Sequence, residues 1–339
     1  MTDVARAAGV SAMTVSYVYS QPGRVSEATA AKVRRAARRL GYPGPHPGAR
    51  SLRRGRAGTL GVVLGEPLTY AFENPQAARF LAGVAGVCAT ERVGLTLVPT
   101  TGAAGDVDRV AEAAVDGFVV WTTADDDPVV DAVAATGLPA VVHAGPGRRG
   151  LPVVGIDDRA AARAIGAEAF AGARRAAVIS FPLDRARRGA TIHGLDPAAA
   201  TFPVTRRRLE GLRDACVATG GAWARVPVIV CSRNSAVDGE AATAQLLRRP
   251  DPPDAIAAMS DELALGALRA AALSRVPVPD RLAVTGWDDT EAAAPAGLTT
   301  VAQSLHDQGA RCARLALGAP STGVHEATWR IVRRASTRT

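Results

Sequence analysis

The chain has 339 residues, of which 47% are apolar and 21% are charged, and its formal net charge is +8. This length and composition are typical of a globular protein with two or three domains, and they exclude an intrinsically disordered chain. No apolar run is long enough to cross a membrane, and the first residues lack the features of a secretory signal, so we expect a cytoplasmic protein. The four cysteines match no zinc-binding or disulfide spacing, and we expect buried free thiols at Cys88, Cys216, Cys231 and Cys312.

The positive charge is concentrated in the first 58 residues. This segment contains eleven lysines and arginines but only two acidic residues, so its net charge is +9, whereas the remaining 281 residues have a net charge of −1. A basic segment attached to a nearly neutral body is typical of a module that binds a polyanion. A solubilising basic tail is the alternative, but such a tail would carry no helical periodicity, and this segment does.

Three short helices are predicted in the first forty residues. The first covers residues 3–8, with Thr2 as its N-cap and Gly9 at its end, and the second covers residues 12–19 after the N-cap Ser11. A third helix follows Ser26. Its inner face is apolar and contains Ala30, Val33, Ala37 and Leu40. Its outer face is basic and contains Arg34, Arg35, Arg38 and Arg39. Two short helices joined by the turn AGVS indicate a helix-turn-helix unit.

The segment DVARAAGVSAMTVSYVYSQPGRVSEATAAKVRRAARRLGY, followed by ARSLRRGRAGTLGVVL, resembles the lac repressor family of bacterial transcription regulators, and the likeness extends from residue 2 to RIVRRAST near the C-terminus. The resemblance implies a helix-turn-helix domain over residues 1–42, a linker and hinge helix over 43–58, and a body over 59–339 that is similar to periplasmic binding proteins. It also implies a homodimer that binds double-stranded operator DNA and responds to a small effector.

The resemblance makes the second helix the recognition helix, which enters the DNA major groove. It places Ala12, Met13 and Tyr17 at the base-reading positions. Alanine and methionine cannot form paired hydrogen bonds with bases, so these two would contact thymine methyl groups, and the tyrosine hydroxyl would bond a base or a phosphate. Four hydroxyl side chains are suited to phosphate oxygens, with helix capping as the alternative role: Thr2, Ser11, Thr14 and Ser16.

The linker PGPHPG over residues 43–48 cannot form a helix, whereas the following ARSLRRGR can. The resemblance implies that this second part is a hinge helix whose Leu52 wedges into the minor groove, with Ala49 and Arg50 beside it. The alternative is that Leu52 packs against the body. The segment is one residue longer and richer in proline than is usual in the family, which makes its geometry a departure from the family pattern.

Apolar runs and amphipathic helices alternate from residue 59 onward. We predict strands at TLGVVL, VGLTLV, DGFVVW, LPAVVH, RRAAVIS, VPVIVC and RLAVTGW, and helices over 76–92, 159–171, 206–219, 239–248 and 262–274. Strands this apolar are typical of parallel sheets covered on both faces, so the fold class is α/β with doubly wound sheets. The resemblance divides the body into lobe one, about 59–156 and 302–320, and lobe two, about 157–301 and 321–339, joined by three crossing strands.

Ligands of open α/β sheets bind at the carboxyl ends of the strands, which here form the cleft between the lobes. The first lobe offers Tyr70, Phe72, Glu73 and Asn74, and the second offers Arg208, Ser260, Asp261 and Asp288. The resemblance makes Arg208 and Asp288 effector contacts, and an arginine with a carboxylate suits a sugar or nucleoside. The alternatives are that Asp288 caps a turn and that Arg208 is solvated within an arginine cluster. Trp287 either stacks on a ligand ring or belongs to the core.

The sequence carries no convincing enzyme signature. GPGRRG at 145–150 has dinucleotide-loop spacing, but an extended run follows it instead of a helix, and Lys32 is the only lysine, so a P-loop is impossible. Residues 125–127, DDD, are expected to be a solvated loop rather than a metal site, and neither a metal nor a cofactor is expected. The sequence therefore predicts an effector-controlled repressor, with a solute-binding protein of the periplasmic type, or less so a sugar or nucleotide enzyme, as the alternative.

Overall fold

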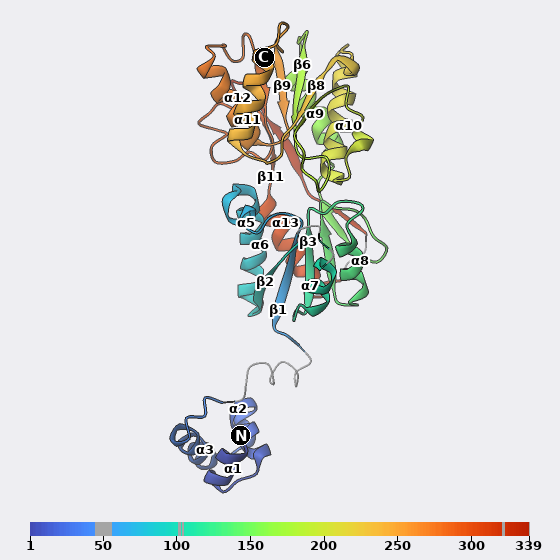
Figure 1. Cartoon of the computed structure of the whole chain (residues 1–339). Helices are drawn as coiled ribbons and strands as arrows, with labels where there is room; N and C mark the ends of the chain where they lie inside the picture. Colours follow the sequence, from blue (N-terminus) through green and yellow to red (C-terminus); the bar gives the residue numbers. More distant parts are fainter. Residues whose placement is uncertain (45–55, 101–102, 104, 321–322, 339) are drawn as a thin grey trace. The chain divides into compact units, whose positions relative to one another are not determined.

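A computed structural model of the chain describes residues 1–44, 56–100, 103, 105–320 and 323–338 (Figure 1). Its contacts divide the chain into two compact units, Met1–Gly58 and Thr59–Thr339, which we describe separately. Within the described residues, no helix has the length and apolar character needed to cross a membrane. All four cysteines are buried free thiols, as the sequence predicts.

The N-terminal unit contains helices α1 (Thr2–Ala8), α2 (Ala12–Ser20) and α3 (Glu27–Arg39) and a short 3₁₀ turn, η1 (Pro22–Arg24). The Ser11 hydroxyl accepts a hydrogen bond from the Thr14 amide at 3.0 Å and so caps α2, and Ser26 caps α3 in the same way. A core of valine and alanine holds the helices together: Val4, Ala5, Ala8, Val15, Val18, Ala30, Val33, Ala36 and Ala37. The predicted three-helix unit is confirmed.

Two details of this unit differ from the predictions. Thr2 lies inside α1, which begins after Met1 without a side-chain cap, so Thr2 is not the N-cap. The helical spacing predicts that Leu40 faces inward, but it ends α3 and is 47% exposed. The chain turns at Gly41 with φ 62°, and Tyr42 packs against the core instead.

The first sheet of the body has the order β12-β5-β4-β3-β1-β2, and all its pairs are parallel. Its strands are β1 (Thr59–Leu64), β2 (Gly94–Pro99), β3 (Gly117–Trp121), β4 (Ala140–His143), β5 (Val153–Gly155) and β12 (Val324–Glu326). Helices α6 (Pro75–Glu91) and α13 (Leu305–Ala316) pack on one face, and α7 (Asp106–Glu112) and α8 (Pro128–Ala135) pack on the other (Figure 1). A one-turn helix, α5 (Tyr70–Glu73), precedes α6.

The second sheet has the order β10-β9-β6-β8-β7, and only its edge strand β7 is antiparallel. Its strands are β6 (Ala176–Ser180), β7 (Ala190–His193), β8 (Pro227–Val230), β9 (Ala255–Ala258) and β10 (Ala283–Thr285). Helices α9 (Asp158–Phe170) and α10 (Pro203–Ala218) cover one face, and α11 (Ala236–Leu247) and α12 (Asp261–Leu273) cover the other. The 3₁₀ turns η2 (Pro197–Ala199) and η3 (Trp223–Arg225) lie in the connections. The α/β class with doubly wound sheets is confirmed.

The chain crosses between the lobes three times. It passes from β5 to α9, returns through β11 (Thr300–Gln303) into α13, and leaves β12 through β13 (Trp329–Val332), which pairs antiparallel with β11. The expected division at residue 321 is therefore wrong for β12, because this strand pairs with β5 and extends the first sheet. Only the chain after β12 returns to the second lobe.

Candidate effector cavity and DNA-binding helix

A cavity of about 390 Å³ lies in the body, and side chains from both lobes line it. The first lobe contributes residues that follow β1, β3 and β4, and the second contributes residues that follow β6, β8 and β10. These are the carboxyl ends of parallel strands, where open α/β sheets bind ligands. Four described lining residues other than glycine have positive φ, namely Thr122 (51°), Ala144 (49°), Arg187 (51°) and Asp288 (106°), and such strained backbone is typical of binding sites.

Arg208 extends from α10 into the wall of the cavity and is only 7% exposed. Its Nε donates to Oδ1 of Asp158 at 2.9 Å, and its Nη1 donates to the carbonyl of Met259 at 2.7 Å. The guanidinium lies 3.8 Å from the ring centroid of Trp287 and 5.4 Å from that of Phe181. The arginine is therefore fixed in place rather than solvated, and Trp287, which is 1% exposed, stacks on it within the core.

Asp288 lines the same cavity and ends a chain of side-chain hydrogen bonds. Gln303 Nε2 donates to Asp288 Oδ1 at 2.8 Å, and Gln308 Nε2 donates to Gln303 Oε1 at 3.0 Å. His143 Nε2 lies 2.9 Å from Gln308 Oε1, and because that oxygen only accepts, this nitrogen carries the proton. Each side chain in this series therefore donates in the direction of the Asp288 carboxylate.

Burial determines the charge of the two residues at the ends of this series of hydrogen bonds, Asp288 and His143. It raises the pKa of Asp288 to about 7, although the nearby Arg208 guanidinium acts in the opposite direction. It also lowers the pKa of His143 to about 4, so this histidine is neutral at physiological pH. The cavity thus contains a carboxylate that titrates near neutrality.

Three of the four predicted residues from the first lobe line the cavity, namely Tyr70, Glu73 and Asn74, whereas Phe72 is 71% exposed and lies outside it. The Tyr70 hydroxyl accepts a hydrogen bond from Asn234 of the second lobe at 3.2 Å. The Asn74 side chain caps α6 by accepting from two backbone amides at 3.0 and 3.1 Å, so its role includes helix capping.

Ser260 and Asp261 do not line the cavity but lie behind its wall. Ser260 caps α12 by accepting from the Leu263 amide and also bonds to Asn234. Asp261 accepts from Thr300 Oγ1 and from the Thr290 amide, both at 2.7 Å, which ties α12 to the crossing strand β11. Their positions fit support of the site rather than contact with its ligand.

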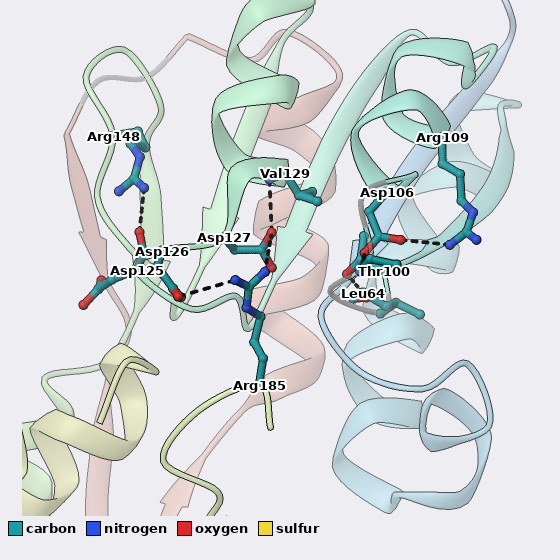
Figure 2. A network of polar contacts seen from close by, with 11 residues as sticks. Leu64, Thr100, Asp106, Arg109, Asp125, Asp126, Asp127, Val129, Arg148 and Arg185 are labelled. Carbon is teal, nitrogen blue, oxygen red and sulfur yellow. Dashed lines mark hydrogen bonds and ion pairs between the residues drawn. The ribbon is translucent and has the colours of Figure 1, made fainter. Parts of the chain in front are cut away.

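Charged side chains also join the two lobes around the cavity. Glu66 pairs with Arg187 at 2.7 Å and Arg79 pairs with Glu291 at 2.6 Å. Figure 2 shows Asp126 of the first lobe pointing toward Arg185 of the second, at 3.4 Å. Sequence reasoning missed these residues, together with Gln303 and Gln308.

The predicted solvated loop at Asp125–Asp127 is structured. Asp125 pairs with Arg206 of the second lobe. Asp127 is 4% exposed and accepts from the Val129 amide at 3.0 Å, which caps α8 (Figure 2). The expectation of a solvated loop is wrong because all three carboxylates have partners: Asp125 and Asp126 contact the second lobe, and Asp127 caps α8. Among the described residues, no group of histidine, cysteine or acidic side chains is arranged to hold a metal ion.

In the N-terminal unit, α2 presents the predicted base-reading residues at its surface. Ala12 and Met13 are exposed, the latter by 63%, and Tyr17 is half-buried with the Arg24 guanidinium 5.6 Å from its ring centroid. Of the four predicted phosphate contacts, Thr2 and Ser11 are exposed and Thr14 is half-buried, whereas Ser16 is buried. Ala49, Arg50 and Leu52 lie outside the described residues.

Comparison with known proteins agrees with this geometry. Residues 1–44 match the model of "bacterial regulatory proteins, lacI family", and residues 169–337 match a periplasmic binding protein-like domain. An HTH-type transcriptional regulator of Mycobacterium tuberculosis, Rv3575c, is 37% identical over 320 residues, which are 93% of this chain and 89% of the relative. The chain belongs to the lacI family. It is a transcriptional regulator with a helix-turn-helix domain and an effector-binding domain, and the solute-binding alternative is not favoured.

Solved structures of lacI-family proteins share the whole fold. A lacI-family transcriptional regulator of Corynebacterium glutamicum superimposes with a TM-score of 0.76 and 28% identity, covering 99% of this chain and 98% of that one. The transcriptional regulator CelR in complex with cellobiose superimposes with a TM-score of 0.67 and 27% identity over the same shares of both chains. The resemblance seen in the sequence is thereby confirmed.

Proposed function

We propose that the protein is a non-enzymatic repressor that binds operator DNA as a homodimer in the cytoplasm, and that a sugar or nucleoside-like effector in the cavity changes its DNA affinity. The observation that carries this proposal is a cavity lined by both lobes, in a chain that also has a helix-turn-helix unit. A ligand that touches both lobes binds their closed arrangement more tightly than an open one, and this difference in affinity is what shifts a two-state equilibrium. The cellobiose complex of the relative CelR supports a carbohydrate as the effector.

The DNA-binding surface is the exposed part of α2 together with the basic charge of the first 58 residues. Met13 and Ala12 provide apolar contact to thymine methyl groups, and Tyr17, stacked on Arg24, provides a hydroxyl for a base or a phosphate. Hydroxyls at Thr2, Ser11 and Thr14 serve phosphate oxygens. Leu52 acts as the minor-groove wedge, with Ala49 and Arg50 beside it.

Footprinting on the DNA upstream of the protein's own gene, with and without a panel of sugars and nucleosides, tests the proposal. We expect protection of a pseudo-palindromic site, loss of affinity as salt is raised, and a change of protection with one member of the panel. Met13→Ala is expected to weaken binding to this site, whereas Val237→Ala, an equally exposed apolar residue of the body, serves as the control. Sequence-independent binding at physiological salt would contradict the proposal.

The role of Leu52 as a minor-groove wedge is tested separately, because the protein can bind its operator and its effector without this wedge. Leu52→Ala is expected to weaken operator binding and to reduce the bend of the DNA measured by gel mobility of permuted fragments. A variant that binds and bends the operator like the parent would remove the wedge from the proposal.

A further inference from the structure

The charges around the cavity favour one chemical class of effector. Three guanidinium groups line it, and each already has a carboxylate partner: Arg187 pairs with Glu66, Arg208 with Asp158, and Arg233 with Asp238. The other lining carboxylates, Glu73, Glu262 and Asp288, have no arginine, lysine or histidine within ion-pair distance in the described part of the chain. The lining thus has more carboxylates than cations, and none of its cations is unpaired.

A phosphate or carboxylate group that enters such a cavity loses its hydration and meets no free cation. The cost of removing an anion from water is recovered only by ion pairs and hydrogen-bond donors, and here the guanidinium groups are engaged by Glu66 and Asp158. Removing a hydroxyl group from water costs much less than removing an anion, and a hydroxyl regains its hydrogen bonds here, because it can donate to a carboxylate and accept from an amide. The arrangement therefore discriminates against anions.

Asp288 is the acceptor best placed for hydroxyl groups. Only its Oδ1 has a side-chain donor among the described residues, from Gln303, so lone pairs of the carboxylate remain for a ligand. Gln303 is in turn held by Gln308, which bonds to the buried His143. The remaining charged groups near this carboxylate are Arg208 on α10, Asp158 on α9 and Asp261 on α12, and each of them is already hydrogen-bonded.

We infer that the cavity discriminates between an uncharged, hydroxyl-rich effector and its phosphorylated counterpart and excludes the latter, and that Gln303 positions the Asp288 carboxylate, which is the effector contact that the family resemblance implies. This inference rests on the proposed function, because it names the effector class of the same cavity. The discrimination between the uncharged and the phosphorylated effector is based on charge and not on the size of the cavity.

Calorimetric titration of the full chain with matched pairs of probes tests the inference. The neutral probes are ribose, glucose, cellobiose and adenosine, and the charged ones are ribose 5-phosphate, glucose 6-phosphate, cellobiose phosphorylated at its 6′-hydroxyl and adenosine 5′-phosphate. We expect at least one neutral probe to bind and its phosphorylated counterpart to bind at least about 100-fold more weakly, since an unpaired buried charge costs several kcal/mol. A phosphorylated probe that binds as tightly as its neutral form, or no response to any neutral probe, would overturn the inference.

Two variants distinguish between two reasons for which the cavity could exclude an anion: the lack of an unpaired cation, and the net negative charge of its lining. Glu66→Gln releases Arg187 from its ion pair, and we expect the affinity for the phosphorylated probe to rise about tenfold. Glu262→Gln removes the same charge from the lining without releasing a guanidinium, so it is the matched control and should change that affinity less. Equal effects of the two variants would show that net charge, and not the pairing of the arginines, excludes the anion.

The positioning role of Gln303 has its own readout. Gln303→Leu removes the donor to Asp288, so the midpoint of the pH profile of sugar binding is expected to move to higher pH, which a purely structural defect would not do. An unchanged midpoint would remove this residue from the inference. DNA footprinting without ligand is scored separately: its failure counts against the proposed function, whereas tight binding of a phosphorylated sugar counts only against the effector class.

Discussion

Replacing Asp288 by asparagine is expected to stabilise the protein and weaken its ligand binding at the same time. Burial raises the pKa of this carboxyl from an ordinary value of 3.8 to about 7, so the folded state holds the proton more tightly than the unfolded state does. The free energy of unfolding therefore falls as the pH rises from about 4 to about 7, and the full cost is present above pH 7. The difference between these two pKa values corresponds to at most about 4 kcal/mol of unfolding free energy.

The expected gain is smaller than this bound, because the side chain borders the cavity and is only half-buried. We expect Asp288→Asn to raise the free energy of unfolding by about 1–2 kcal/mol at pH 8, with the gain shrinking as the pH falls toward 4. Asparagine keeps the acceptor for Gln303 and tolerates positive φ well, so neither effect masks the charge. Sugar affinity is expected to fall at least about tenfold, since the charged acceptor is lost.

Urea unfolding followed by circular dichroism at pH 8 and pH 5, with calorimetric titration of the neutral sugar, measures both effects. Asp289→Asn is the matched control: this neighbour also has positive φ (50°), but it pairs with Arg334 at 2.7 Å, so its neutralisation should destabilise the protein at pH 8. If Asp288→Asn were less stable than the parent at pH 8, the argument from burial would be refuted.

Three further changes have definite expected outcomes. Arg185→Ala removes the contact with Asp126 between the lobes, which contributes about 0.5 kcal/mol. Sugar affinity should therefore fall about twofold in dilute buffer, and this loss should disappear in about 1 M salt. A loss that does not depend on salt would argue against an electrostatic contact. Ser11→Ala removes the N-cap of α2, which should cost about 1 kcal/mol and accelerate amide exchange in that helix; unchanged exchange would show that the cap is dispensable. Gly309→Ala would place a methyl group against the backbone of Phe80 in α6, so the thermal midpoint should fall by several degrees, and an unchanged midpoint would mean that the two helices can separate slightly.

The parts of the fold that the sequence predicts well are those with strong local signals. β1, β3 and β4 are continuous apolar runs because helices cover both faces of their sheet, and this pattern is visible without any partner. Likewise, Ser11 and Ser26 cap the helices that follow them, because the cap is a contact between residues three positions apart.

The missed strands are short, lie at sheet edges, or depend on distant partners. β7 is an exposed antiparallel edge strand with the mixed sequence ATIH, and β12 has only three residues. Neither is long enough for an alternation of apolar and polar residues to be recognised. β12 joins the first sheet only because β5, some 170 residues earlier, offers an edge. Strand pairing at this separation is not encoded in local periodicity.

The same distinction applies to the site. Arg208 and Asp288 could be proposed because the family resemblance assigns effector contacts to them, and Asp288 also follows a predicted strand; the structure places both in the cavity wall. Gln303 and Gln308 could not, since a glutamine at the start of a helix or the end of a strand has no special meaning until its partners are known. The pairing of Asp126 with Arg185 joins residues 59 positions apart in sequence, and no spacing rule identifies it.

The division of the core explains how a small ligand can control the body. Among the residues that the structure describes, no apolar core cluster contains strands of both sheets: two clusters enclose the first sheet and two enclose the second. The contacts between the lobes are instead polar, such as Glu66 with Arg187 and Tyr70 with Asn234, and contacts of this kind contribute about 1 kcal/mol or less each, because water replaces them when they open. Two lobe arrangements can therefore differ by only a few kcal/mol, and a few hydrogen bonds from an effector to both lobes are enough to decide between them. Had the lobes shared an apolar core, a sugar could not supply the free energy needed to separate or close them.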